Sequence, residues 1–445
     1  MIRAIKGTRD ILPPSSAVWN HVERVAREVF RTFNYQEIRT PIFEETALFA
    51  RGVGEDTDIV GKEMYTWEDR DGTSLTLRPE NTASVMRAYI EHRLDQVVGV
   101  KKYYYMGPMF RRERPQKGRY RQFYQIGAEA IGSDSPIIDA EVIEMVVEIL
   151  RGCGLMDFHL ILNSVGDHKC RPVFMAALKE QLKDVAHTMC ADCQRRANTN
   201  PLRVLDCKVP EDQPIIATLP SILDYLCQDC NRHFAIVKAH LDARGIPYEV
   251  RPRLVRGLDY YMRTTFEITH GSLGAQNSVL GGGRYDGLAE SLGSKVPAPG
   301  IGFSIGEDRL VMSVEETQAA APVVDVFLAP MGDKAEKVAG DLAAFLRKAK
   351  IREGPAEPRR LSVERSVDRK LKRALETASK IGARFVVILG DDEIEGKYYT
   401  LRNMRLQEQH RLTRQQIIGF IQDQLAELQQ ITHAVADIDR TFKQI

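Results

Sequence analysis

The stretch MGPMFRRERPQKGRYRQFYQIGAEA, residues 106–130, carries five arginines and one lysine around a single turn that contains proline and glycine. Strand-like sequence precedes Pro115 and follows Gly118, so the pattern predicts a β-hairpin with the loop RPQKG at its tip. Guanidinium groups bind phosphate through paired hydrogen bonds, which makes this hairpin a candidate phosphate site. The alternative is an exposed hairpin whose charged edges prevent unwanted strand pairing.

Side chains of a strand alternate between its two faces, and this alternation predicts which hairpin residues share a site. Phe123, Gln125 and Glu129 are expected on one face of the second strand. Arg111 and Glu113 are likewise expected to share a face of the first strand. An aromatic ring stacks on a nucleobase, and Gln and Glu side chains hold a small polar ligand. We therefore expect a nucleotide site that adjoins a small-molecule site.

The composition is that of an ordinary globular protein: of 445 residues, 43% are hydrophobic and 28% are charged. The length suits two or three domains. The N-terminal sequence MIRAIKGTRD has no apolar run typical of a signal peptide, and no stretch approaches the roughly 20 apolar residues of a membrane span. We therefore expect a cytoplasmic protein with no membrane partner.

Lysine plus arginine number 62 and aspartate plus glutamate 61, so the net charge does not indicate a polyanionic partner. The local charge is less even, because residues 347–373 contain eleven basic and four acidic residues. Such a run is usually the solvated face of a helix, but it is also the pattern of an RNA-binding surface. The charge pattern alone favours the solvated face.

Hydrophobic periodicity predicts a protein that mixes helices and strands. Helices are expected at residues 22–33, 137–152, 335–350 and 369–381, and strands at 35–42, 158–165, 254–261, 323–329 and 384–389. From residue 169 to about residue 240 the chain is helical and bears cysteines, which indicates an inserted domain. The alanine-rich segment EETQAAAP, residues 315–322, marks a second boundary, and strands and helices alternate beyond it.

The hairpin resembles motif 2 of the class II aminoacyl-tRNA synthetases, and LVRGLDYY, residues 254–261, resembles a signature of the histidyl-tRNA synthetases. Further matching pieces occur in family order: KGTRDILP (6–13), RTPIFE (39–44), TLRPENTA (76–83), GGGRYDGL (281–288) and GIGFSIGEDRL (300–310). GGGRYDGL alone would be a weak signal, because it lacks the Gly-Lys-Ser/Thr ending of a P-loop. Together these pieces make nearly the whole chain similar to histidyl-tRNA synthetases.

The resemblance implies an α+β fold: the antiparallel sheet of class II synthetases with flanking helices, a helical insertion and a C-terminal α/β domain. The implied domains are a catalytic core in two parts (1–168 and 241–318), the insertion (169–240), an anticodon-binding domain (322–425) and a tail (426–445). The family places motif 1, here residues 22–42, at a dimer interface, which implies a homodimer. The same residues also suit an ordinary helix–strand unit. Residues 352–364 depart from the family pattern, so no anticodon contacts are assigned there.

The resemblance also implies the reaction, in which ATP with Mg²⁺ activates L-histidine as an adenylate and histidine is then transferred to the 3′ end of histidine tRNA. Arg111 and Arg256 are the implied catalytic cations at the α-phosphate. The implied ATP site consists of Arg111, Glu113, Arg119, Phe123 and Arg309. Taken alone, Arg256 also suits a buried ion pair and Arg309 a helix surface. The strand before Arg309, however, brings it to a helix start, where phosphate is favoured.

Histidine has one donor and one acceptor on its neutral ring, so its selection requires a polar clamp. The implied histidine site consists of Glu80, Thr82, Gln125, Glu129, Arg256, Tyr260, Tyr261 and Tyr285. Without the resemblance, Glu80 and Thr82 are also suitable first-turn residues of a helix. Arg114 and Gln116 match positions that read the extra guanosine at the 5′ end of histidine tRNA. No side chain is an obvious base for the tRNA hydroxyl, so we expect the adenylate phosphate to accept that proton.

Two other classes of function share some of these sequence features. A regulatory subunit of histidine biosynthesis resembles the catalytic core but generally lacks the anticodon-binding domain and has degraded signatures. This chain keeps Arg111, Glu113, Arg256 and Arg309 and continues past residue 322, which favours the enzyme. A plain RNA-binding module does not explain Gln125 and Glu129 on the small-ligand face.

Within the predicted insertion, Cys190-Ala-Asp-Cys193 and Cys227-Gln-Asp-Cys230 form two C-x2-C pairs, with Cys207 between them. Two such pairs supply four thiolates to one tetrahedral zinc, and a cytoplasmic location argues against disulfides. We therefore expect one structural Zn²⁺ held by Cys190, Cys193, Cys227 and Cys230. Cys153 and Cys170 fall outside this spacing and are expected to be ordinary buried thiols.

Overall fold

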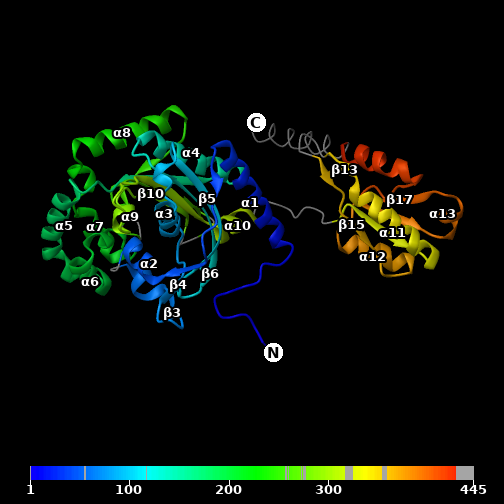
Figure 1. Ribbon diagram of the computed structural model, residues 1–445, viewed down its shortest axis with the longest axis horizontal. Coiled ribbons are helices and arrows are strands. Elements are labelled where there is room, and N and C mark those ends of the chain that lie inside the picture. Colours follow the sequence, from blue (N-terminus) through cyan, green and yellow to red (C-terminus); the bar gives the residue numbers. More distant parts are fainter. Residues whose placement is uncertain are drawn as a thin grey trace. The chain divides into compact units, whose positions relative to one another are not determined.

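The structure is a computed structural model that describes residues 2–54, 57–116, 118–255, 258, 260–271, 273, 277–315, 324–352 and 358–426. The chain divides into two compact units, residues 1–319 and 320–445 (Figure 1). Among the described residues, no helix combines the length and the apolar character needed to cross a membrane.

The first unit is built on an eight-stranded sheet. Its strands lie in the order β1 (Gln36–Glu37), β5 (Lys101–Phe110), β6 (Gln122–Ile131), β11 (Gly300–Gly306), β10 (Ser278–Arg284), β9 (Met262–His270), β7 (Phe158–Ser164) and β8 (Glu249–Val250). The central strands from β5 to β7 all pair antiparallel, whereas the two-residue strands β1 and β8 pair parallel at the edges. This is the sheet that the class II resemblance predicts.

Helices bury one face of this sheet. They are α1 (Ser15–Thr32), α4 (Pro136–Gly152), α8 (Gln228–Ala243) and α10 (Glu307–Glu315). Their apolar residues recur at helical spacing, as in Val22, Ala26 and Phe30 of α1, and this stripe packs on the strands. The ring of Phe30, for example, stacks on Tyr104 of β5 with ring centres 4.4 Å apart. The core therefore holds the sheet rigidly from behind.

The opposite face of the sheet is only partly covered. The helices α3 (Thr82–Glu91) and α9 (Leu288–Ser291) pack on it beside β5, and α2 (Thr46–Val53) lies next to α3. A smaller sheet in the order β2 (Phe43–Glu45), β4 (Ser74–Leu77), β3 (Tyr65–Glu68) precedes α3. A cavity remains on this face of the large sheet, between the hairpin, α3 and the strands β10 and β11.

Residues 169–240 are helical, as expected, with α5 (Arg171–Val185), α6 (Ala191–Thr199), α7 (Gln213–Thr218) and the first part of α8. Short 3₁₀ turns connect them at Ala186–Thr188, Pro201–Asp206, Pro210–Asp212 and Ile222–Tyr225. In Figure 1, α5, α6 and α7 lie together beside the sheet. Their own core is small and includes Phe174, Leu178 and Leu182 of α5 together with two buried cysteines, Cys193 and Cys207.

The second unit has a five-stranded sheet in the order β15 (Val363–Arg365), β12 (Val326–Pro330), β16 (Phe385–Leu389), β17 (Tyr399–Asn403), β18 (Gln409–Leu412). The first three strands are parallel, and β17 and β18 are antiparallel. The helices α11 (Asp333–Lys348), α12 (Leu371–Lys380) and α13 (Asp391–Glu395) accompany this sheet, and the short pair β13 (Lys350–Ile351) and β14 (Arg359–Arg360) lies beside it. The alternation predicted from the sequence thus gives the expected α/β unit.

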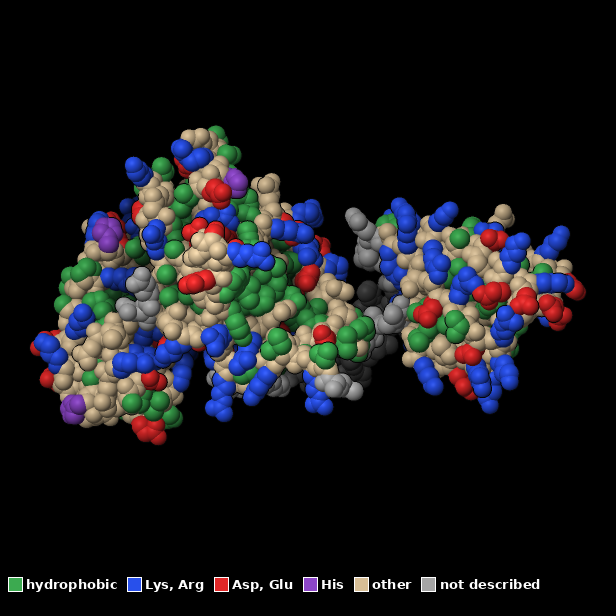
Figure 2. Space-filling view, turned by 60° about the horizontal axis from the view of Figure 1, so that its bottom comes forward, with side chains coloured by type: hydrophobic (Ala, Val, Ile, Leu, Met, Phe, Trp, Pro, Cys, Tyr) green, Lys and Arg blue, Asp and Glu red, His purple; other side chains and the backbone are tan. Residues whose placement is uncertain are grey.

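Basic side chains are spread over the face of the second unit that Figure 2 shows, and acidic side chains gather toward one end. Within residues 347–373, several arginines form ion pairs: Arg359 with Asp325, Arg365 with Glu336, and Arg369 with Asp333. Other basic residues of this stretch are exposed, namely Lys348, Lys350, Arg352, Arg360, Lys370, Lys372 and Arg373. The stretch is therefore partly a set of structural ion pairs and partly an exposed basic surface.

Two predicted strands are shorter or absent. The strand expected at residues 35–42 pairs with β5 only at Gln36–Glu37, because the guanidinium of Arg78 takes the carbonyls of Thr40 and Pro41. The sequence also predicts a strand over LVRGLDYY, but its described residues (254, 255, 258, 260 and 261) lie in no strand, and β9 begins at Met262. Here the Asn163 side chain donates to the carbonyl oxygens of Pro252 and Leu254 at 3.1 and 2.9 Å, which replaces ladder hydrogen bonds.

Candidate active site

The alternation along β6 separates the core from the site. Ile126, Ala128 and Ala130 face the helix-covered core. Phe123 and Gln125 line the cavity on the opposite face, and Glu129 points the same way beneath it. The two-residue period predicted from the sequence is therefore the feature that delivers these polar side chains to one place.

A single cavity of about 190 Å³ gathers most of the predicted site residues. Those that line it are Glu80, Thr82, Arg111, Glu113, Arg119, Phe123, Gln125, Tyr260, Tyr261, Tyr285 and Arg309. Glu129 is fully buried just behind Thr82 and Tyr285 and does not line the cavity itself. Arg114 and Gln116 are exposed on the hairpin loop and stand outside the cavity. Arg256 lies outside the described residues, and its role stays a prediction.

Arginines form the cationic part of the cavity. The Arg111 Nε donates to the carbonyl oxygen of Pro79 at 2.9 Å, and its guanidinium lies 5.2 Å from the ring centre of Phe123. Arg119 contacts the Glu113 carboxylate at 3.1 Å. These contacts hold each guanidinium in place while leaving further N–H donors available, because a guanidinium carries five. The geometry suits a preorganised phosphate site.

Arg309 approaches the same space from the first turn of α10. Its Nη1 donates to the carbonyl oxygen of Ser278 at 2.7 Å, and its Nε donates to that of Gly118 at 3.2 Å. The second contact ties α10 to the hairpin turn. A helix start also carries partial positive charge, so this part of the cavity favours an anion.

The other part of the cavity is built around Glu129. Its two carboxylate oxygens accept hydrogen bonds from Thr82 at 2.7 Å and from Tyr285 at 2.5 Å, and Tyr105 donates more weakly at 3.4 Å. Burial raises the pKa of Glu129 to about 8, although these hydrogen bonds oppose the shift. Without a ligand, Glu129 therefore positions the hydroxyls of its neighbours.

The close approach of Glu129 to β11 explains a glycine in the GIGFSIG stretch. A Cβ atom on Gly302 would lie 1.7 Å from Glu129 Oε2, a separation that no side chain tolerates. Gly302 is thus required for space at this position. Tyr105, which lines the cavity and contacts Glu129, was not among the predicted site residues. Its place on β5, in the tyrosine run at residues 103–105, gives no distinctive sequence signal.

Glu80 and Gln125 present acceptor groups to the cavity. The Glu80 carboxylate accepts the backbone N–H groups of Thr82 and Ala83 at 2.7 and 3.0 Å, so it caps the start of α3. Burial raises the pKa of Glu80, and these backbone hydrogen bonds counteract the shift. Among the described residues, the side-chain oxygen of Gln125 is buried and has no hydrogen-bond partner. It is available to a donor on a ligand.

The tyrosines enclose the same region. The rings of Tyr260 and Tyr261 have centres 4.7 Å apart, and Tyr260 meets Tyr285 edge-on at 5.9 Å. The backbone carbonyl of Tyr261 accepts a hydrogen bond at 3.0 Å from Arg171, in the first turn of α5. The inserted helices are therefore connected directly to a cavity residue.

The cysteines are arranged differently from the expectation. The two C-x2-C pairs do not meet in one site but belong to separate clusters, which we name the neck cluster (Asp167, Cys170, Cys227, Cys230) and the inner cluster (Cys190, Cys193, Cys207, Asp212). Each cluster combines three thiols with one carboxylate, so the expected four-cysteine site is wrong. Cys170 is buried, as expected, but it also lies in the neck cluster, whereas Cys153 is fully buried and belongs to neither cluster.

The helix starts explain this difference. Cys170, Cys190 and Cys227 each directly precede the first residue of a helix, so each pair follows its own helix to a different place. Cysteine spacing alone does not reveal the aspartates. Asp167 and Cys170 have the same x2 spacing as the cysteine pairs, and that signal was present in the sequence.

Comparisons with known proteins agree with this geometry. The family model for histidyl-tRNA synthetase matches residues 7–310, and the model for the anticodon binding domain matches residues 325–424. A histidine–tRNA ligase of Solibacter usitatus is 69% identical over 94% of this chain and 98% of its own length. One from Koribacter versatilis is 54% identical over 95% of this chain and 96% of its own length.

Among solved structures, the apo histidyl-tRNA synthetase of S. aureus is 37% identical and superimposes with a TM-score of 0.77, covering 95% of this chain and 100% of its own. The family model covers more than half of the chain, and the first of these relatives aligns along nearly all of it. On these grounds, and with the arginine and tyrosine cavity in place, the chain belongs to the histidyl-tRNA synthetase family.

Proposed function

We propose that this protein is a histidine–tRNA ligase, which uses ATP to join L-histidine to the 3′ end of histidine tRNA through a histidyl adenylate and releases AMP and pyrophosphate. The observation that carries the proposal is the single cavity, which has arginines for a triphosphate in one part and hydroxyl, amide and carboxylate groups for histidine in the other. An enzyme that joins two bound substrates requires such adjoining sites.

In the first step, the histidine carboxylate attacks the α-phosphorus of ATP, the new P–O bond forms, and the bond to pyrophosphate breaks. Negative charge accumulates where the two anions meet. Arg111 and Arg256 are the proposed cations at the α-phosphate, while Arg119 and Arg309 hold the far phosphates and Glu113 and Phe123 orient the adenine. Mg²⁺ enters as part of the ATP substrate. The fixed position of Arg309 supports its role, because a preorganised cation needs no rearrangement during the reaction.

The proposed histidine site selects the substrate by its ammonium and its ring. Glu80, Thr82 and Gln125 receive the ammonium, and the unpartnered buried oxygen of Gln125 supports this role. Tyr261 and Glu129 are proposed for the ring, with Tyr260 and Tyr285 around them. Glu129 accepts from Thr82 on one oxygen and from Tyr285 on the other, and its remaining lone pairs can accept from the ring as well.

In the second step, the 3′-hydroxyl of the tRNA attacks the carbonyl carbon of the adenylate, AMP leaves, and the adenylate phosphate accepts the hydroxyl proton. Arg114 and Gln116 are proposed to contact the 5′ end of the tRNA, and their exposure on the hairpin loop supports this role. The second unit is proposed to bind the anticodon. Its match to the anticodon binding domain model and its exposed basic residues support that assignment.

A regulatory, non-catalytic relative is the competing function. The match over residues 325–424 disfavours it, because such subunits generally lack this domain. We further propose that the enzyme is a cytoplasmic homodimer. Ile42, Phe43 and Trp67 are exposed large apolar side chains at and beside motif 1, which supports a partner there. Light scattering after size exclusion measures the oligomeric state directly.

The test of the proposed function is histidine-dependent exchange of pyrophosphate with ATP, followed by charging of histidine tRNA. Both reactions are expected with histidine, and neither with other amino acids. Histidine binding without exchange would indicate the regulatory function instead.

A further inference from the structure

The neck cluster and the inner cluster have the same composition, three thiols and one carboxylate, although they arise from different parts of the sequence. In each cluster the four potential ligand atoms lie within 4.8 Å of one another. We propose that each cluster holds one zinc ion, so that the protein carries two structural zinc sites of the Cys₃Asp type. Geometry, burial and the repetition of the pattern all support metal binding at both clusters.

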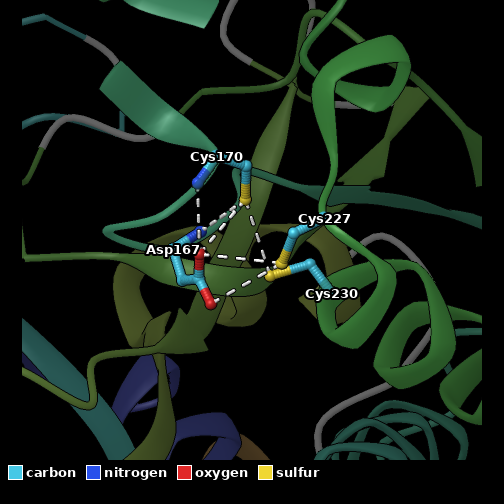
Figure 3. Close-up of side chains that lie close together, drawn as sticks. All are labelled: Asp167, Cys170, Cys227 and Cys230. Atoms are coloured by element: carbon cyan, nitrogen blue, oxygen red, sulfur yellow. Dashed lines mark hydrogen bonds between the residues drawn. The ribbon is translucent and has the colours of Figure 1, made fainter. Parts of the chain in front are cut away.

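The neck cluster has the spacing of a zinc site. Figure 3 shows the three sulfurs and the Asp167 carboxylate pointing toward one another. Zinc holds sulfur at about 2.3 Å and carboxylate oxygen at about 2.1 Å, so a tetrahedron places two sulfurs about 3.8 Å apart and sulfur and oxygen about 3.6 Å apart. The observed separations are 3.7 Å between the sulfurs of Cys170 and Cys230, and 3.2 and 3.9 Å from Asp167 Oδ1 to Cys170 and Cys227.

The inner cluster repeats these distances with another arrangement of residues. The sulfurs of Cys190 and Cys207 are 3.9 Å apart, and the sulfur of Cys207 is 3.2 Å from Asp212 Oδ2. A disulfide would instead require about 2.05 Å between the sulfurs. Both clusters therefore have the separation expected for sulfurs that share a metal, and neither has that of a bond.

Burial indicates that a cation belongs in each cluster. Asp167 is 3% exposed and Asp212 is 2% exposed, and a buried carboxylate next to thiolates is costly unless positive charge compensates it. Arg263 Nη2 lies 3.9 Å from Asp167 Oδ2 and supplies one positive charge to the neck cluster, but three thiolates and a carboxylate carry four negative charges. Three thiolates and one carboxylate suit zinc, which accepts sulfur and oxygen ligands in a tetrahedron. Four protein ligands fill that tetrahedron, so both sites are structural and leave no position for a substrate.

The two sites would stabilise different parts of the insertion. The neck cluster joins residues at its two ends, because Asp167 and Cys170 precede α5 while Cys227 and Cys230 begin α8. The inner cluster joins the start of α6 to the segment at Cys207 and Asp212. Since these helices have only a small apolar core of their own, metal ligation takes over part of the stabilisation.

The first test is the metal content of the full-length protein purified without chelator. Elemental analysis is expected to find two zinc ions per chain. Cys170→Ser and Cys207→Ser should each remove about one zinc, and the double variant should remove both. Cys153→Ala is the matched control, since this buried cysteine lies outside both clusters, and it should keep two zinc ions. One zinc per chain in the wild type, or no zinc even after incubation with zinc chloride, overturns the two-site proposal.

The second test uses the wild-type protein alone and therefore does not depend on whether a variant folds. Replacement of zinc by cobalt(II) should give the intense visible bands of a tetrahedral ion and a sulfur-to-cobalt charge-transfer band, at two cobalt ions per chain. A colourless or octahedral spectrum contradicts the proposal. Thiol titration in denaturant with chelator should find all seven cysteines reduced, whereas fewer free thiols would mean that the clusters form disulfides.

Discussion

The eight-stranded sheet and the insertion of residues 169–240 position their polar side chains in different ways. On the sheet, neighbouring strands and a deep apolar core place Gln125 and Glu129 at fixed points of one face. In the insertion, short helices with little core bring their starting residues together, and the clusters form where those starts meet. The comparison shows that a regular period determines the position of a functional side chain only where a large core supports the element.

The largest effect is expected in the sheet-built cavity. Arg111→Ala should lower histidine-dependent pyrophosphate exchange by about 100- to 1000-fold, because it removes a preorganised cation from the transition state. Circular dichroism and the melting temperature should stay close to those of the wild type. Arg112→Ala is the matched control, since Arg112 is exposed and does not line the cavity, and it should change the rate only slightly. Equal losses in both variants would mean that the hairpin acts through its fold.

Variants at the hairpin tip test whether the fixed positions of side chains on the sheet continue into the loop at its end. Arg114→Ala with Gln116→Ala should lower kcat/KM for tRNA charging by roughly 10- to 100-fold, the loss typical of a base contact. Adenylate formation should be nearly unchanged. With a tRNA that lacks the extra 5′ guanosine, the wild type and the variant should charge at similar rates. A persistent difference on that tRNA would assign these residues to another contact.

The contact between the two regions gives a smaller effect. Arg171→Met keeps the aliphatic stem but loses the hydrogen bond to the Tyr261 carbonyl, so KM for histidine should rise by about tenfold. The KM for ATP should not change. Lys169→Met is the control, because its ion pair with Asp229 is exposed and contributes little. An unchanged KM for histidine would show that the insertion and the cavity act independently.

The last prediction concerns stability rather than activity, in the core behind the sheet. Burial raises the pKa of Glu307 from 4.5 to about 9, with Glu23 and Asp308 adding to the shift and Arg27 opposing it. Between these two values the folded state keeps a proton that the unfolded state has lost, so the free energy of unfolding falls as the pH rises. Among the described residues, both carboxyl oxygens of Glu307 lack a hydrogen-bond partner, so no hydrogen bond adds to the attraction of Arg27 for the ionised form.

Glu307→Gln should remove this dependence. The melting temperature of the variant minus that of the wild type should increase as the pH is raised from 4.5 toward 9. The increase should be roughly 2–4 °C for each kcal/mol that the wild type loses from its free energy of unfolding. Glu28→Gln, on the exposed side of α1, should leave the pH dependence as it is. A difference that is constant over this range would mean that Glu307 does not titrate there.

The sequence predicts the features that have a local cause. The hairpin, the alternation that separates Ile126 from Gln125, and Arg309 in the first turn of a helix all follow from short-range patterns. The short β1 does not, because its end depends on Arg78 binding two distant carbonyls. The composition of the two clusters does not follow from short-range patterns either, because spacing cannot reveal which cysteine pair meets which partner after folding.

The neck cluster also has a consequence for how this chain can change over time. Cys170 and Cys227 are 57 positions apart in the sequence but belong to one cluster, so the intervening segment leaves and rejoins the catalytic fold at nearly the same point. A segment with adjacent ends can be lengthened, shortened or replaced while the strands around it keep their register. The cluster therefore marks a place where the catalytic fold can accept new sequence without losing its site.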